Sequence, residues 1–186
     1  MKKKITITII CAVLSCVCLI GTTFAWLTDK TETVTNTFTV GNVDIDLTET
    51  TGSTYKMVPG AELDKDPTVS VTEGSEACWL FVKIEEINNT FGADPVQKFV
   101  TYTVAAGWTL VPGQTDVYYR QVNANPSTGT VDAVTYSVLA NDQIIINSAA
   151  TAADLATATN TKLAFTAYAA QQSGLTVEQA WALFTA

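Results

Sequence analysis

The sequence predicts a mostly β fold, namely a jelly-roll-like antiparallel β-sandwich that ends in a short C-terminal helix. Three observations lead to this prediction. Short segments of alternating apolar and polar residues recur along the chain, turn pairs such as Pro112-Gly113 and Asn125-Pro126 separate them, and one segment near the C-terminus has helical spacing. Many short strands at such intervals favour two sheets packed face to face.

The N-terminus has the pattern of an export leader. Three lysines at positions 2–4 precede a long uncharged, mostly apolar stretch, as in a secretory signal peptide. Small residues, Thr23 and Ala25, stand where a signal peptidase needs them. We therefore expect residues 1–25 to be a signal peptide that is cleaved between Ala25 and Trp26, leaving a secreted domain.

Two other kinds of leader are less compatible with the sequence. The uncharged span continues to Thr28 and could then cross a hydrocarbon core of roughly 30 Å as a retained anchor. Gly21 and the threonines after it are unfavourable within such a span. A lipid anchor on Cys16 is disfavoured by bulky Leu14, where a small residue is expected. Contact with a membrane is thus expected only through the uncleaved leader.

Charge and cysteine content exclude further partners and structural features. Removal of residues 1–25 leaves 7 of the 10 basic residues and all 18 acidic ones, so the net charge becomes −11. Nucleic acid is an unsuitable partner for such a chain, because phosphate binding needs clustered Lys and Arg, and Arg120 is the only arginine. Only Cys78 lies outside the leader, so the 161 residues that follow must be stabilised by an apolar core, without an internal disulfide.

The first strands are predicted from strict alternation. In residues 34–40, Val34, Phe38 and Val40 share one side and threonines the other. Residues 43–47 alternate again and place two aspartates toward water, and residues 68–72 form a further short strand.

The strongest strand signal covers residues 78–85, where Cys78, Leu80, Val82 and Ile84 form one apolar row. This strand is expected at the centre of the core. Turn residues separate the later candidate strands, which are residues 99–104, 117–122, 134–139, 143–146 and 163–170.

One helix is predicted near the C-terminus, because Val177, Ala180, Trp181 and Phe184 recur with helical spacing behind a capping box that begins at Thr176. The alanine- and threonine-rich residues 148–161 are expected to form a loop that can hold a short helix. The residues predicted for the core are Phe38, Val40, Leu80, Val82, Ile84, Phe165, Trp181 and Phe184.

The sequence lacks the usual chemistry of an enzyme. It contains no histidine, which removes the common general base and zinc ligand, and no cofactor or catalytic residue is predicted. Cys78 is expected to be core packing and not a nucleophile. Asp44 and Asp46 share one strand face and are weak calcium candidates, but an acidic, solvated face explains them better. We therefore expect binding and assembly, not catalysis.

Several segments resemble a known bacterial family. They are Phe24-Ala25-Trp26-Leu27-Thr28-Asp29 with residues 36–45 after it, the Pro-Gly loop at residues 58–66, the strand at residues 79–84, and residues 164–171 with the helix behind them. Together they are similar to the TasA/camelysin (CalY) family of Gram-positive surface and biofilm-matrix proteins. The junction after the leader is the specific part of this resemblance.

The resemblance implies a function as well as a fold. It implies export through a SipW-type signal peptidase, followed by assembly of a jelly-roll subunit into extracellular matrix fibres at the cell surface. In such fibres the freed segment, residues 26–37, adds as a strand to the next subunit, with Trp26, Leu27, Val34 and Thr35 in the assembly strand and residues 38–186 as the sandwich. The partner would be a second copy or a related fibre subunit.

Three alternatives stay open at the level of sequence. Residues 34–40 can pair within their own sandwich as an ordinary first strand. The chain can be an accessory or anchoring subunit of fibres made mainly by another protein. It can also be a camelysin-like surface metallopeptidase, although the absence of histidine and of an HExxH motif disfavours this.

Overall fold

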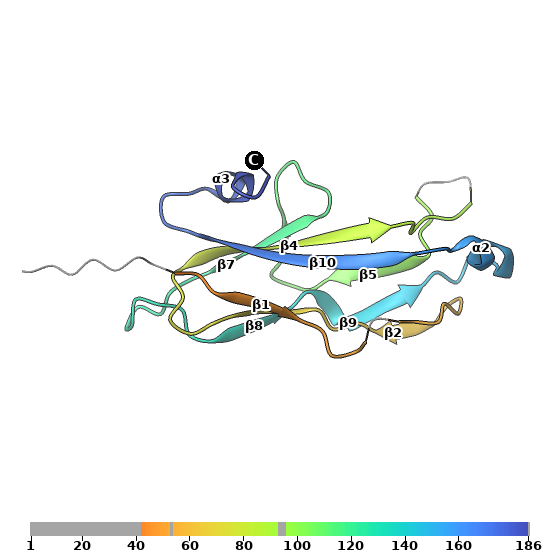
Figure 1. Cartoon of the computed structure of the whole chain (residues 1–186), viewed down its shortest axis with the longest axis horizontal. Coiled ribbons are helices and arrows are strands. Elements are labelled where there is room, and N and C mark those ends of the chain that lie inside the picture. Colours follow the sequence, from red (N-terminus) through yellow and green to blue (C-terminus); the bar gives the residue numbers. More distant parts are fainter. Residues whose placement is uncertain (1–41, 53, 93–95, 186) are drawn as a thin grey trace, which may run out of the picture. The chain divides into compact units, whose positions relative to one another are not determined.

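The computed structural model describes residues 42–52, 54–92 and 96–185. These residues belong to one compact unit, which is mostly β, and every strand pair described in it is antiparallel. Figure 1 shows the strands arranged in layers, with the short helices α2 (Ala152–Thr157) and α3 (Val177–Ala182) beside them. The predicted fold class, a β-sandwich with a C-terminal helix, is confirmed. The predictions for the leader, its cleavage, the assembly strand, Phe38 and Val40 lie outside the described residues.

The first layer is a four-stranded sheet in the order β10-β4-β7-β6. Its strands are β4 (Cys78–Ile87), β6 (Thr109–Leu110), β7 (Val117–Val122) and β10 (Lys162–Gln171). Strand β10 pairs with β4 along its whole length, from Lys162 opposite Ile87 to Gln171 opposite Cys78. The long apolar alternation predicted for the central strand is therefore present in β4, which has a partner on each edge.

The second layer consists of two three-stranded ladders, β1-β3-β8 and β2-β9-β5. Their strands are β1 (Ile45–Thr48), β2 (Glu62–Asp64), β3 (Thr68–Val71), β5 (Val100–Val104), β8 (Val134–Ser137) and β9 (Leu139–Ile146). Only Val138 separates β8 from β9, and the Val138 amide donates to the carbonyl of Pro67 between β2 and β3, at 2.9 Å. The two ladders thus continue into each other.

Two apolar clusters lie on opposite faces of β4. Leu80, Val82 and Ile84 are fully buried in the larger cluster, which both layers share. Phe81 is fully buried in the smaller one, together with Val117 and residues of the C-terminal helix. Each cluster removes large side chains from water. Every large apolar side chain that is fully buried stabilises the fold by roughly 1.5–3 kcal/mol.

The C-terminal helix α3 (Val177–Ala182) covers the smaller cluster. The Thr176 hydroxyl accepts a hydrogen bond from the Gln179 amide, and the Gln179 side chain accepts one from the Thr176 amide, as a capping box requires. Trp181 is buried and lies 5.5 Å from Phe81 between ring centroids. Phe184, expected in the core, is 37% exposed, because α3 ends before it and leaves its ring at the rim of the cluster.

Two details differ from the sequence prediction. A short helix, α2 (Ala152–Thr157), forms within residues 148–161, also behind a capping box. Strand β9 runs through residues 140–142, which were expected to be a turn, while Asn141 and Asp142 have positive φ angles of 57° and 53°. The pairing with β5 shifts register at this point, so the turn signal marks a β-bulge instead of a strand end.

One arginine holds a turn against the first layer. The Arg120 Nε atom of β7 donates to the Gly107 carbonyl at 3.1 Å, and its guanidinium also bonds the Ala106 carbonyl. The same guanidinium lies 4.2 Å from the ring centroid of Tyr136 and 5.2 Å from that of Trp108. A Cβ atom at position 107 would lie 1.9 Å from the guanidinium, so the turn requires glycine.

Val82→Asp is expected to unfold the domain. Val82 is fully buried, and an unpaired carboxylate there should cost about 4 kcal/mol or more. Thermal unfolding followed by circular dichroism measures this, with Thr103→Asp on an exposed position of β5 as the control. A normal melting transition for Val82→Asp would show that β4 is not the central strand.

Gly107→Ala should destabilise the domain by roughly 1–2 kcal/mol more than Gly113→Ala, because only the first change displaces a paired guanidinium. Both glycines have positive φ, 89° and 80°, but a Cβ atom at Gly113 would meet nothing within 4 Å. Chemical denaturation of both variants gives the difference, and equal losses would contradict a role for Arg120 in holding the turn.

Candidate binding pocket beside strand β10

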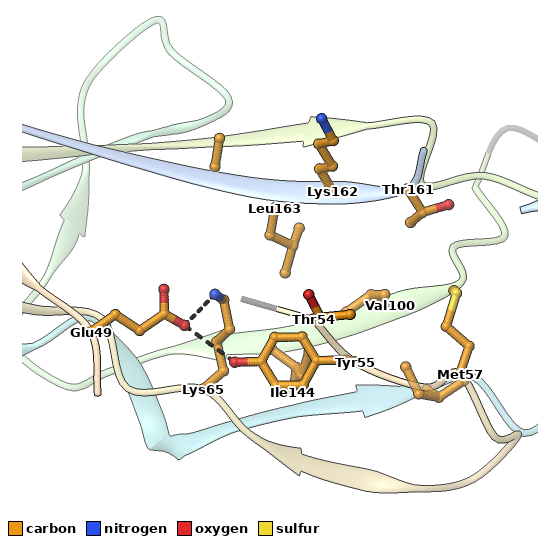
Figure 2. Close-up of a pocket in the computed structure, with 12 residues that line it drawn as sticks. Glu49, Thr54, Tyr55, Met57, Lys65, Val100, Ile144, Thr161, Lys162 and Leu163 are labelled. Atoms are coloured by element: carbon orange, nitrogen blue, oxygen red, sulfur yellow. Dashed lines mark hydrogen bonds and ion pairs between the residues drawn. The ribbon is translucent and has the colours of Figure 1, made fainter. Parts of the chain in front are cut away.

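A pocket of about 440 Å³ opens between the two layers near the start of β10. Figure 2 shows Leu163 of β10 and the ring of Tyr55 facing the same space from opposite sides. The pocket is lined by Glu49, Thr54, Tyr55, Met57, Lys65, Val100, Ile144, Ile146, Thr161, Lys162, Leu163 and Ala164. Its size is within the usual range of ligand sites, and most of its lining is apolar.

Strand β10 is an edge strand beside this pocket. All its strand pairing is with β4, and the described residues show no ladder on its other edge. Strand β1 lies alongside part of that edge without pairing with it. An unpaired edge exposes backbone N–H and C=O groups that can accept another strand.

The wall opposite β10 is formed by what we name the cover segment, residues 49–52 and 54–57. It has no strand structure and is held by side chains. The carboxylate of Asp66 accepts hydrogen bonds from the amides of Thr50 and Thr51, at 2.9 and 3.0 Å, and from both their hydroxyls. The Tyr55 hydroxyl donates to the carbonyl of Gly52 at 2.6 Å.

Asp66 depends on these threonines electrostatically as well. The side-chain hydrogen bonds from Thr50 and Thr51 hold the pKa of Asp66 well below its usual range. A carboxyl group with a depressed folded-state pKa stabilises the fold above its unfolded pKa, and this contribution is lost as the pH falls below about 4. Attachment of the cover segment should therefore weaken in acid.

Lys65 is the unusual residue of the pocket. It follows β2 and is 7% exposed, although lysine is rarely buried unless it is paired. Its ammonium forms an ion pair with Glu49 and lies 5.4 Å from the ring centroid of Tyr55 and 5.5 Å from that of Phe165. Figure 2 shows Lys65 and Tyr55 both joined to the Glu49 carboxylate. The charge is thus neutralised inside a mainly apolar wall.

This arrangement suits binding better than catalysis. The carboxylate of Glu49 is already paired with the Lys65 ammonium, and the remaining lining offers apolar surface and hydroxyl groups. The pocket can therefore take an apolar or aromatic group beside a neutralised ammonium.

The residues singled out in the sequence lie elsewhere. Cys78 is fully buried in the larger cluster, and burial raises the pKa of its thiol to about 11, so it stays protonated at neutral pH. Asp44 and Asp46 are exposed on one face at the start of β1. Among the described residues, no group of three or more His, Cys, Asp or Glu could hold a metal ion.

Sequence reasoning missed Lys65, Glu49 and Asp66 as site residues. The sequence signal for a buried lysine was weak, because Lys65 stands in a segment that was interpreted as a Pro-Gly loop. Its ion-pair partner, Glu49, lies 16 residues away in the sequence.

Comparison with known proteins gives one match. The family model described as camelysin metallo-endopeptidase matches residues 1–77. The resemblance to the TasA/camelysin family is confirmed over this part. No curated protein and no solved structure matches the chain. The camelysin match includes β1, β2, β3, the cover segment and Lys65, and therefore one whole wall of the pocket.

The family description implies a metal, and the residues present do not fit one. Zinc in peptidases is held mainly by histidine together with carboxylates, and this chain contains no histidine. The part of the chain that the structure describes also lacks any suitable ligand cluster.

No helix among the described residues is long and apolar enough to cross a membrane.

Asp66→Ala should release the cover segment without unfolding the domain, because it removes the acceptor of the Thr50 and Thr51 bonds. Lys56 is exposed within this segment, so trypsin cleavage after it should become several-fold faster. Asp64→Ala changes an exposed carboxylate two residues away and is the control. Equal cleavage rates for both variants would contradict the role of Asp66.

Proposed function

We propose that this protein is a secreted structural subunit of extracellular matrix fibres, and that each subunit donates residues 26–37 as a strand to the next. Removal of the leader by a SipW-type signal peptidase frees this segment. The observation that carries the proposal is the edge of β10, which has no described ladder partner and lies beside an open apolar pocket.

The physical basis is β-strand addition. A strand that pairs with an open edge gains affinity from main-chain hydrogen bonds, and its alternate side chains enter pockets that give specificity. An unprotected edge is a liability that folded proteins usually cover, so an edge beside a pocket favours a specific partner strand. The camelysin match supports a surface or matrix protein.

The donated segment has the composition that this role needs. Residues 31–37 are mainly threonine, with Val34 among them, and such β-branched residues favour extended structure. The same segment contains neither glycine nor proline.

Electron microscopy of two purified forms tests the proposal. One form begins at Trp26, and the other lacks residues 26–35. If both are folded by circular dichroism, only the longer form should produce ordered fibres. Fibres of the same kind from both forms would contradict strand donation by this segment.

A companion assay addresses the peptidase alternative. We expect the purified mature protein to leave casein intact. Cleavage that is abolished by a chelator and restored by zinc would instead support a metallopeptidase.

A further inference from the structure

We propose that the pocket beside β10 receives the Trp26 side chain of a second copy, so that subunits join head to tail. This inference rests on the proposed function and identifies the receiving site, the anchoring residue and the polarity of the contact. Three sets of observations carry it: the start of β10, which pairs only with β4 among the described residues, the lining of the pocket, and the place where the chain enters its own domain.

The start of β10 is where a strand can be added. Residues 161–164 line the pocket, and the cover segment lies opposite them without pairing. A strand pairing with about the first five residues of β10 would occupy roughly 17 Å. Residues 26–30 provide that length, and the remaining residues up to 41 can span about 35 Å between two subunits.

The pocket suits an aromatic anchor. Leu163, Met57 and the ring of Tyr55 provide apolar contacts, and the Lys65 ammonium already lies near two aromatic rings. A tryptophan ring can pack against such a wall and interact with the ammonium through its face. In a strand, Trp26 and Leu27 point to opposite faces, so only one of them enters the pocket, and the larger volume favours Trp26.

The head-to-tail polarity of the proposed contact follows from the positions of the chain entry and the pocket at opposite ends of β10. The Glu76 amide donates to the Asn42 carbonyl, and the Gln172 amide donates to the Ala77 carbonyl, both at 2.9 Å. The chain therefore enters its domain beside the C-terminal end of β10, whereas the pocket lies at the N-terminal end. Ten residues of strand, or about 33 Å, separate these points.

This separation favours a second copy as the donor. Strand β1 begins only three residues after Asn42 and lies alongside β10. A chain that filled its own pocket would have to reverse at once and run back past β1. A second copy can approach the pocket end directly, and the repeated contact between different surfaces builds an open filament.

The first experiment fills the pocket in the full mature chain. Leu163→Trp, with its side chain in the pocket, should reduce fibre mass roughly ten-fold or more in sedimentation and microscopy, as expected for loss of an anchoring contact. Trp26→Ala should reduce it similarly. Thr166→Trp introduces the same side chain at an exposed position of β10 and should assemble normally. Thermal melting verifies that each variant is folded.

A second experiment does not depend on the folding of Leu163→Trp. Chains carrying only Leu27→Cys are mixed with chains carrying only Thr161→Cys, and fibres are oxidised mildly. The native Cys78 is fully buried, so it should not compete. Disulfide-linked dimers are expected for this pair, and Ser127→Cys on an exposed loop is the matched control in place of Thr161→Cys.

The outcomes separate the two proposals. If the unmodified mature chain forms no fibres, the proposed function fails. If it forms fibres, but Leu163→Trp assembles as well as Thr166→Trp, or both cysteine pairs link equally, then strand donation stands and the pocket is not the receiving site. Loss of assembly with selective linking at residue 161 supports the inference.

Discussion

Strand β4 carries side chains into two separate cores, and the rest of the arrangement depends on it. Leu80 and Phe81 are neighbours in the chain, yet Leu80 packs between the layers and Phe81 packs under α3. Because both faces are buried around Leu80 and Phe81, the backbone groups of β4 there must pair within the sheet along both edges. Strands β7 and β10 satisfy them, and this leaves β10 as the edge of its layer.

The outer edge of β10 is covered by neighbouring segments and not by a hydrogen-bonded strand of the described chain. Strand β1 and the cover segment lie beside β10, but neither forms a ladder with it in the described residues. The cover segment is held through Asp66 and the Glu49–Lys65 pair, which are side-chain contacts. The hydrogen bonds between Asp66 and the two threonines are exposed and contribute little free energy each, so the part of the wall that they hold can open at a lower free-energy cost than a paired strand.

The sequence predicted the central features and missed the local ones for physical reasons. The apolar row of β4 and the capping box at Thr176 are dense, short-range signals, and both are present. Strands β2 and β6 have three and two residues, too few for a visible alternation. The pocket depends on Lys65 and on partners 10 residues or more from it, and tertiary contacts of this kind leave no periodic pattern.

Charge sets a further condition on any assembly of this protein. Cleavage after Ala25 would leave a chain of net charge −11 that repels its copies, and salt screens this repulsion only beyond about 8 Å at physiological ionic strength. Contact must therefore come from short-range interactions, namely main-chain hydrogen bonds and buried apolar side chains. Residues 26–37 have a net charge of only −1 and would approach Lys162 and the Lys65 pocket. The receiving site that we propose thus lies where the exposed Lys162 reduces the electrostatic cost of approach, while the charge of Lys65 is already neutralised by Glu49.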